Sequence, residues 1–320
     1  MRGGDVAFRC NFGTLDSKGI IVDRRAGRIR SGTDRISKTL NGLKFGDVEV
    51  IFKEGVEHRA ALVLRGPGLS PNVSDADPHE TGRAVLKAKA TSPDGEKTAK
   101  VLNSFVEKSI ELLREHPLNK ERVKDGQLPV NVVLPRGAGI VPSIPDINEA
   151  RGMKVACVAG VTLVKGVCRA AGLHIEEVPG ATGGTDTDMM AKASATVCLL
   201  DGYDMVLVNV KAPDLAGHDG DARGKVQIIE RIDEAVGYIM ENMPRDAVLA
   251  VTADHSTPCS FKEHTGDPVP LVIMARGQRI DGIGSYDEVS CSHGGLGRLR
   301  GHELLPVLLN MSGRTKKYGA

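Results

Sequence analysis

Two short apolar runs, each followed by residues of the types that bind metal ions, constrain the fold of this chain more than any other feature. The runs cover residues 205–210 and 247–253. The residues of metal-binding type that follow them are Asp214, His218, Asp254, His255 and His264. Short runs rich in β-branched residues, with a helical segment between them, are typical of neighbouring strands in a parallel sheet that is buried on both faces. Because ligands bind at the carboxyl ends of such strands, we expect these five side chains to lie close together.

These five residues form a mixed nitrogen and oxygen ligand set. Imidazole and carboxylate ligands together suit Mn²⁺ or Zn²⁺. A single histidine in such a place is as often an ordinary core or surface residue. An aspartate directly followed by a histidine at a strand end, as in Asp254 and His255, is difficult to explain by packing alone. The sequence therefore predicts a metal centre at this edge of the sheet.

Composition excludes several classes of function. The 320 residues, of which 41% are hydrophobic, are enough for two domains with their own cores. A net charge of +1 argues against a nucleic-acid or membrane surface, so we expect a small-molecule partner. No run approaches the roughly 18 apolar residues that span a bilayer. The six cysteines contain no C-x-x-C pair, which favours reduced thiols and a cytoplasmic location.

The amino-terminal part of the chain predicts a domain of several strands and one long helix. Strand-like runs cover residues 4–11, 48–52, 59–65 and 130–134, and a shorter one lies within residues 20–30. A helix is expected to begin near Glu96 and to end near His116, before Pro117. The Pro-rich stretch 141–145 indicates a crossing between domains, so we predict domains of 1–145 and 146–320.

The remainder of the chain alternates strands with helices. Strands are expected at residues 154–159, 174–178, 205–210, 247–253 and 270–275. Helices are expected at residues 161–171, 189–200, around 229–240, and at 302–311. This alternation predicts a doubly wound α/β domain.

Three charged features allow two interpretations each. The five ionisable residues in 20–30 form either an exposed charged edge or an anion-binding rim. Asp75, Asp77 and His79 lie in a long loop and have the chemistry of metal ligands, but no second cluster accompanies them. Lys165 is either a solvated helical lysine or a fixed cation that faces a phosphate group.

Several motifs extend these predictions to a known family. The most specific ones are Ala-Pro-Asp-Leu-Ala-Gly-His at 212–218, Thr-Ala-Asp-His at 252–255 and Glu-His-Thr-Gly-Asp-Pro-Val-Pro at 263–270. Others lie at 4–11, 23–28, 70–75, 179–183 and 301–304. Together they resemble the cofactor-independent, or 2,3-bisphosphoglycerate-independent, phosphoglycerate mutases of the archaeal type. That family belongs to the alkaline phosphatase superfamily, and the resemblance covers essentially the whole chain.

The resemblance implies a two-metal phosphoserine enzyme of glycolysis and gluconeogenesis that interconverts 3-phosphoglycerate and 2-phosphoglycerate. It implies an alkaline-phosphatase-like α/β sheet domain at 146–320 with a second α/β substrate domain, the cap, at 1–145. One metal ion would be held by Asp214, His218 and His264, and the second by Asp254 and His255. Both ions would be Mn²⁺, with Mg²⁺, Co²⁺ or Zn²⁺ as alternatives.

Further roles follow from the same resemblance. The residues expected to bind the substrate are Arg9, Arg24, Arg28, Arg59 and Arg65. Lys165 is the expected counterpart of the family's phosphate-side lysine. The expected partner is a small phosphorylated substrate, with a homo-oligomer as an open alternative and with no nucleic acid or membrane.

The chain departs from the family pattern at its start. The pattern opens with an apolar strand that ends in Asp-Gly and carries the nucleophilic serine before the position of Met1, so we expect residues 1–320 alone to show little mutase activity. Two alternatives remain open. One is a metal-dependent phosphohydrolase, and the other is an inactive metal-binding fragment.

Overall fold

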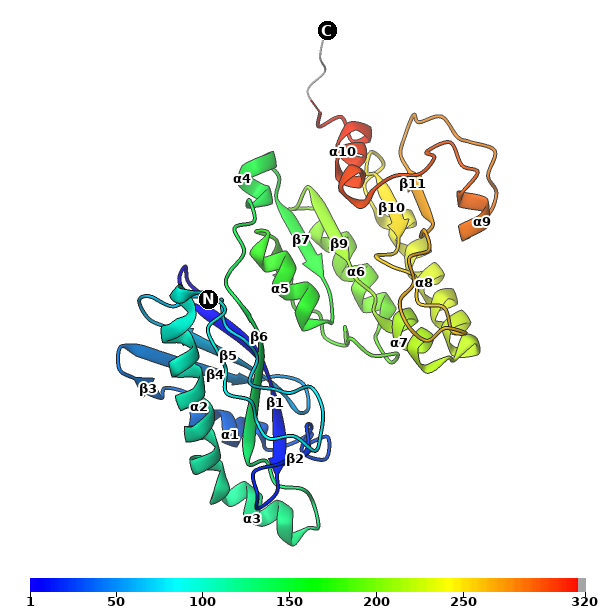
Figure 1. Ribbon diagram of the computed structural model, residues 1–320. Helices are drawn as coiled ribbons and strands as arrows, with labels where there is room; N and C mark the ends of the chain where they lie inside the picture. The colour runs from blue at the N-terminus through cyan, green and yellow to red at the C-terminus, as the bar shows by residue number, and fades with distance from the viewer. Residues whose placement is uncertain (316–320) are drawn as a thin grey trace. The chain divides into compact units, whose positions relative to one another are not determined.

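Residues 1–143 are built around an antiparallel sheet of six strands (Figure 1). The computed structural model describes residues 1–315, and the chain divides into two units after Ser143. The strands of the first unit are β1 (Val6–Leu15), β2 (Ile21–Asp23), β3 (Lys44–Phe45), β4 (Val48–Glu54), β5 (Arg59–Arg65) and β6 (Val132–Gly139). Strand β1 is central, because it pairs with β2, β5 and β6.

One face of this sheet is covered by helices. The helices of the unit are α1 (Thr33–Leu40), α2 (Glu96–Arg114) and α3 (Pro117–Lys124), with a short 3-10 turn, η1 (Pro93–Gly95), before α2. Side chains alternate along a strand, so the fully or almost fully buried Phe12 and Phe52 point to one face. There the Phe52 ring lies 5.8 Å from Phe105 of α2, measured between ring centroids. The opposite face carries the polar residues of β1 and β5.

The second unit contains a parallel sheet in the order β8-β7-β9. These strands are β7 (Val155–Val158), β8 (His174–Glu176) and β9 (Met205–Val208). A separate antiparallel pair is formed by β10 (Leu249–Thr252) and β11 (Leu271–Met274). The helices are α4 (Ile147–Arg151), α5 (Thr162–Ala170), α6 (Met189–Leu199), α7 (Ala212–Asp219), α8 (Ala222–Asn242), α9 (Glu288–Cys291) and α10 (Gly301–Met311). The predicted α/β fold class is confirmed.

One prediction about the two apolar runs is wrong. Strands β9 and β10 were expected to be neighbours in one sheet that is buried on both faces. Within residues 1–315 they lie in different sheets, and no strand pairs with the second edge of β9. Leu207 and Val208 of β9 are each 37% exposed. Apolar patterning identifies a strand, but it does not identify the strand that pairs with it.

Among the described elements, the sequence analysis missed five helices, α1, α3, α4, α7 and α9, and misplaced the end of strand β6. Helix α1 has only two apolar residues, Ile36 and Leu40, one turn apart, which is too short a pattern to recognise. Helix α3 begins directly after His116, at Pro117, where we expected one helix to end and no second helix to begin. Strand β6 continues past the predicted end at residue 134 to Gly139, and it therefore includes Arg136.

Within the described residues, no helix is both long and apolar enough to cross a membrane.

Candidate metal centre

Helix α7 places two of the predicted metal ligands on one face. Asp214 and His218 are four residues apart, so their side chains lie about one helical turn apart on the same side of the helix. Pro213 is accommodated in the first turn, where its missing N–H has no partner in the helix anyway. The helix ends at Gly220, whose φ of 75° is the left-handed conformation that favours glycine. The sequence predicted these ligands directly after a strand, whereas they lie on a helix.

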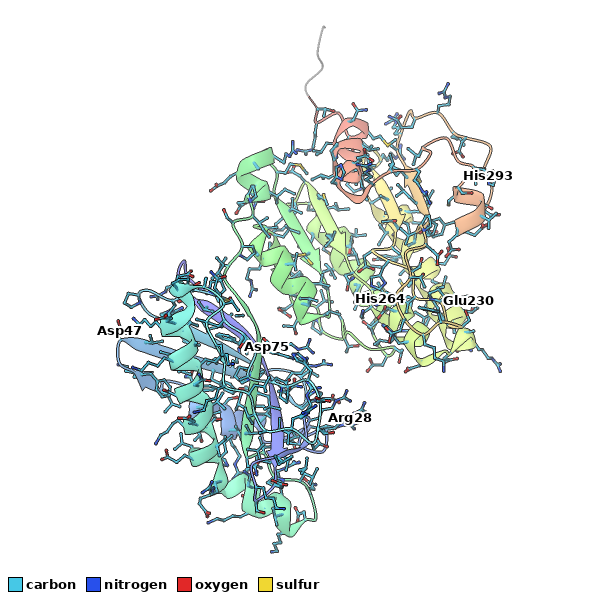
Figure 2. The ribbon with its side chains drawn as sticks, viewed as in Figure 1. Arg28, Asp47, Asp75, Glu230, His264 and His293 are labelled. Atoms are coloured by element: carbon cyan, nitrogen blue, oxygen red, sulfur yellow. The ribbon has the colours of Figure 1, made fainter. Side chains whose placement is uncertain are left out.

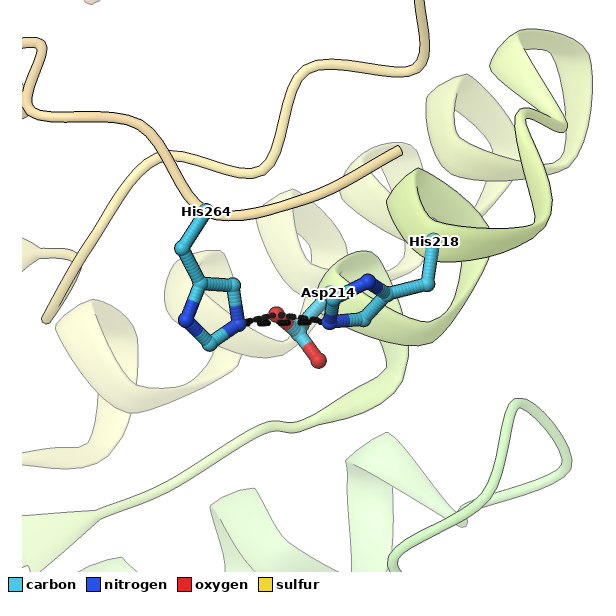
Figure 3. A group of neighbouring side chains, drawn as sticks. All are labelled: Asp214, His218 and His264. Carbon is cyan, nitrogen blue, oxygen red and sulfur yellow. Dashed lines mark hydrogen bonds and ion pairs between the residues drawn. The ribbon is translucent and has the colours of Figure 1, made fainter. Parts of the chain in front are cut away.

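A loop that follows β10 brings His264 to the same place (Figure 3). The ligand atoms of Asp214, His218 and His264 all lie within 4.8 Å of one another. The Nε2 atom of His264 is 3.2 Å from Oδ1 of Asp214 and 3.2 Å from Nε2 of His218. A backbone bridge between Ser256 and Thr265 closes the loop and fixes where His264 emerges. The structure therefore brings this predicted triad together.

The hydrogen bond of His218 shows that the triad suits a cation. Its Nδ1 atom lies 2.9 Å from the carbonyl oxygen of Lys262, which can only accept, so Nδ1 carries the proton. The Nε2 atom of the neutral ring then offers a lone pair toward Asp214 and His264. Lys262 holds its carbonyl there with a φ of 60°, which is uncommon for a residue other than glycine. Two nitrogens and one carboxylate oxygen form a donor set that fits a divalent metal ion.

Asp214 carries the negative charge of the centre. Its Oδ2 atom lies 2.6 Å from Nζ of Lys211, and its Oδ1 atom accepts a hydrogen bond of 2.8 Å from Thr257. Burial raises the pKa of Asp214, but the adjacent ammonium group of Lys211 and the hydrogen bond from Thr257 outweigh it. The net effect lowers the pKa of Asp214, so the carboxylate is ionised at neutral pH.

The second predicted pair adjoins this triad. The Nε2 atom of His255 is 3.8 Å from Oδ1 of Asp214, and its ring stacks on His264 with centroids 3.8 Å apart. Asp254 is at the edge of the group, with its side chain 80% exposed and Oδ2 3.6 Å from Nε2 of His255. All five residues that the sequence singled out are thus linked by contacts in one cluster.

Two lysines differ in how they are held. Lys165, on α5, pairs with Glu177 at 2.5 Å. Lys192, on α6, is 2% exposed and donates to the backbone oxygen of Asn209 at 3.1 Å. Burial, followed by the charge of Lys165, lowers the pKa of Lys192. The Oδ1 atom of Asn209 is also buried and has no hydrogen-bond partner among the described residues. The chain therefore holds a buried cation near the carboxyl end of β9.

Sequence reasoning missed Lys192, although a signal was present. Met189, Ala193 and Thr196 form the buried stripe of α6, at the spacing of one helical face. Lys192 lies on that same stripe, where a lysine is rarely placed unless it has a partner or a function. A lysine on an otherwise apolar or small-residue stripe was the available clue.

In the first unit, three arginines share the sheet face opposite the helices. Arg9 on β1 is the direct pairing partner of Arg136 on β6, and Arg59 on β5 lies two residues from the partner of Arg9 on that strand. Burial and the charges of Arg136 and Arg59 lower the pKa of Arg9. Two buried atoms, Nε of Arg136 and Oδ1 of Asn11, have no hydrogen-bond partner among the residues described. This face of the sheet therefore gathers several positive charges, and some of its polar atoms have no hydrogen-bond partner among the described residues.

The other predicted arginines are held differently. Arg24 forms two hydrogen bonds with the carboxylate of Asp77, at 3.0 and 2.6 Å. It borders a hollow of about 410 Å³ that His79 also lines. Arg65 forms two hydrogen bonds with Asp5, at 2.9 and 2.8 Å. Arg28 lies exposed in the loop after β2 (Figure 2).

The loop residues Asp75, Asp77 and His79 have other partners than a metal ion. Asp77 is engaged by Arg24. Asp75 accepts from the backbone N–H of Gly137 at 2.7 Å and lies 2.9 Å from Nε2 of His79. The His79 ring also contacts Arg136 at 3.3 Å through Nδ1. These contacts order the loop against the arginine face.

Comparison with known proteins gives consistent results. A family model described as the Metalloenzyme superfamily matches residues 29–311. A 2,3-bisphosphoglycerate-independent phosphoglycerate mutase of Methanothermobacter thermautotrophicus is 47% identical over 326 residues, covering 100% of this chain and 79% of that protein. The corresponding protein of Methanopyrus kandleri is also 47% identical, over 100% of this chain and 78% of its own length.

Solved structures agree with these sequence matches. A protein from Pyrococcus horikoshii has a TM-score of 0.84 and 36% identity, covering 100% of this chain and 77% of its own. A cofactor-independent phosphoglycerate mutase from Thermoplasma acidophilum has a TM-score of 0.74 and 38% identity, covering 98% of this chain and 79% of its own.

Proposed function

The chain belongs to the Metalloenzyme superfamily and, within it, to the 2,3-bisphosphoglycerate-independent phosphoglycerate mutases, and from this membership we propose that it interconverts 3-phosphoglycerate and 2-phosphoglycerate by a two-metal phosphoserine reaction. The family makes it an isomerase with a small phosphorylated substrate. The observation that carries the proposal is the convergence of Asp214, His218 and His264 on one point, in a chain matched over its full length by named mutases.

We propose that these three residues hold one Mn²⁺ ion, and that Asp254 and His255 contribute to a second. Divalent ions in such a site neutralise phosphoryl oxygens and stabilise the charge of an in-line transfer. The residues of the chain orient those ions. His218 is fixed by the carbonyl of Lys262, and Asp214 by Thr257 and Lys211, so the donor atoms are held before any ion binds.

The lysines of the second unit are proposed to interact with the phosphoryl group. Lys165 keeps the role that the family resemblance gives it, although its ion pair with Glu177 must open for it to do so. Lys192 is added on the strength of its burial, because a desolvated ammonium group with one backbone acceptor has two further N–H donors to offer. A fixed cation in a low-dielectric site stabilises developing negative charge more than a solvated one does.

The arginines of the first unit are proposed to bind the carboxylate and phosphate groups of the substrate. Support is strongest for Arg9 and Arg59, which are exposed and share a face with Arg136. Guanidinium groups bind such anions through paired hydrogen bonds. Arg24, Arg28 and Arg65 are included in the proposal, but Arg24 and Arg65 already engage Asp77 and Asp5.

We also propose a cytoplasmic location, which the free thiols of all six cysteines support. Self-association is proposed through the exposed apolar residues of β9 and β11, among them Leu207, Val208 and Val272. Sedimentation velocity would test it. Val272→Lys should shift the protein toward monomer, while Leu163→Lys, on exposed α5, should not.

An enolase-coupled assay with 3-phosphoglycerate and Mn²⁺ tests the proposed function. It is applied to residues 1–320 and to the same chain fused to the part of the Methanothermobacter relative that lies outside the match, about a fifth of that protein. We expect the fusion to form 2-phosphoglycerate without releasing inorganic phosphate. Release of phosphate without 2-phosphoglycerate would instead identify a phosphohydrolase. No turnover and no binding of 3-phosphoglycerate in either form would leave only a metal-binding protein.

A further inference from the structure

Thr257 touches both predicted sets of metal ligands. It is buried, with 4% of its surface exposed. Its Oγ1 atom lies 2.8 Å from Oδ1 of Asp214, in the first set, and 3.2 Å from Nδ1 of His255, in the second. Neither contact is apparent from the sequence, because Thr257 follows the Asp254-His255 pair and has no ligand chemistry of its own.

The single hydroxyl proton determines the direction of both hydrogen bonds. The ionised carboxylate of Asp214 can only accept, so the hydroxyl donates to Asp214. The hydroxyl oxygen must then accept from His255, which requires the proton of the neutral ring to be on Nδ1. The Nε2 atom of His255 is left with its lone pair, 3.8 Å from Oδ1 of Asp214 and 3.6 Å from Oδ2 of Asp254.

The position of this hydroxyl is fixed by packing. The backbone oxygen of Thr257 accepts a hydrogen bond of 2.8 Å from Nζ of Lys225 on α8. Gly217 of α7 rests directly against Thr257, and a Cβ atom at position 217 would lie 2.4 Å from the Thr257 oxygen and 2.9 Å from its methyl carbon. A threonine also has few χ1 rotamers available. The hydroxyl is therefore held in place by the same contact that docks α7.

We propose that Thr257 is a positioning residue that couples the two metal sites, by orienting Asp214 for the first and selecting the Nδ1-protonated tautomer of His255 for the second. The inference rests on the proposed metal centre. Loss of a partner that orients a ligand typically weakens metal binding by about 10- to 100-fold. Because one hydroxyl serves both ligands, removing it should weaken both sites together.

Three variants separate this role from a general effect on the fold. Thr257→Val keeps the branched shape but removes the hydroxyl. Thr257→Ser keeps the hydroxyl and removes the methyl group. Thr14→Val is the matched control, because Thr14 is also buried and its hydroxyl donates to the Pro129 oxygen at 2.6 Å, in the first unit. Circular dichroism is used to check that each variant is folded.

The first readout is the tautomer of His255 in metal-free protein, from ¹⁵N chemical shifts measured near pH 8.5, where an ordinary histidine is neutral. We expect protonated Nδ1 in the wild type and Thr257→Ser, and a mixture in Thr257→Val. A wild-type ring protonated on Nε2 would overturn the proposal without recourse to any variant.

The second readout is calorimetric titration with Mn²⁺. We expect Thr257→Val to bind about 10- to 100-fold more weakly, and Thr257→Ser and Thr14→Val to bind as the wild type does. Unchanged binding in Thr257→Val would overturn the coupling. If the wild type binds no Mn²⁺, the proposed metal centre fails, and the coupling that rests on it fails too. In that case the ¹⁵N measurement still shows separately whether Thr257 selects the tautomer of His255.

Discussion

The Nε2 atoms of His218 and His264 lie 3.2 Å apart, each beside the same carboxylate oxygen of Asp214. Two neutral rings at this distance are favourable only if one donates to the other, and a bound cation would satisfy both lone pairs at once. The three donor atoms therefore lie where one cation could contact all of them, and removing one ring tests this arrangement.

We expect His218→Ala to abolish the first metal site. The substitution removes one of three ligands and also the contact with Lys262, so the affinity for Mn²⁺ should fall by more than the roughly 10- to 100-fold that follows the loss of a residue that only orients a ligand. Calorimetry should report a lower stoichiometry. His293→Ala serves as the control, since the His293 ring lies within hydrogen-bond distance of the Ser292 hydroxyl and the Val289 oxygen, beside α9. Equal stoichiometry in all three proteins would rule the site out.

We expect Arg9→Gln and Arg65→Gln to differ in their effect on substrate binding. Arg9 faces the open side of the sheet, so losing its charge should weaken binding of 3-phosphoglycerate by about tenfold or more. Arg65 is already bound to Asp5, so its replacement should weaken binding less than that of Arg9 and should also lower the melting temperature. Titration of each variant in the presence of Mn²⁺ checks this. Equal weakening by both substitutions would show that the contact with Asp5 does not reduce the part that Arg65 has in binding.

The Asp5–Arg65 pair should make stability depend on pH. Hydrogen bonds from Arg65 lower the pKa of Asp5 from its ordinary value of 3.8, against an opposing effect of burial. A carboxyl group with a lowered folded-state pKa stabilises the protein above its unfolded-state pKa, and the benefit is lost as the pH falls through the folded-state pKa. Asp5→Asn should therefore lower the melting temperature at pH 7, and the difference from wild type should shrink below about pH 4. A difference that is constant from pH 7 to pH 3 would contradict this account.

Lys192 should reduce stability while supporting function. Because burial lowers its pKa, the unfolded chain binds more protons than the folded one just below the ordinary lysine pKa, so stability should rise with pH as Lys192 loses its charge. Lys192→Met should then raise the melting temperature at pH 7 and remove this pH dependence. If Lys192 faces the phosphoryl group, the same variant should lower kcat of the active fusion by roughly 10²-fold.

Lys165→Met is the matched comparison for the second lysine. If Lys165 has the role that the family resemblance gives it, its loss should also lower kcat of the active fusion by roughly 10²-fold. If it serves only its ion pair with Glu177, kcat should stay near the wild-type value. Near-normal turnover in both lysine variants would show that neither ammonium group stabilises the transition state.

The metal ligands could be predicted from the sequence because their chemistry is local. An Asp-His pair and an Asp-x-x-x-His spacing identify candidates without knowledge of the fold, and the structure brings Asp214, His218 and His264 together. Long helices such as α2 were predictable for the same reason, since a repeating apolar stripe is written into consecutive residues.

What the sequence did not predict depends on contacts between distant segments. Nothing near Arg136 indicates that it pairs with Arg9, which lies 127 positions earlier and becomes its neighbour only through the register of β1 and β6. The burial of Lys192 and the two hydrogen bonds of Thr257 likewise arise from packing between elements. The prediction that β9 and β10 pair was wrong for the same reason, because the residue pattern of a strand does not indicate which strand lies beside it.

Gly217 sits between the two ligands of α7 and performs none of their chemistry, yet its lack of a side chain allows the helix to rest on Thr257. The practical consequence concerns transplantation of the site. An engineer who copied only Asp214 and His218 onto another helix would reproduce the spacing of the donors but not the depth at which the helix sits. A transplanted site would therefore need helix α7 together with the backbone around Thr257 against which it packs. Any side chain at position 217 would move both donors away from His264.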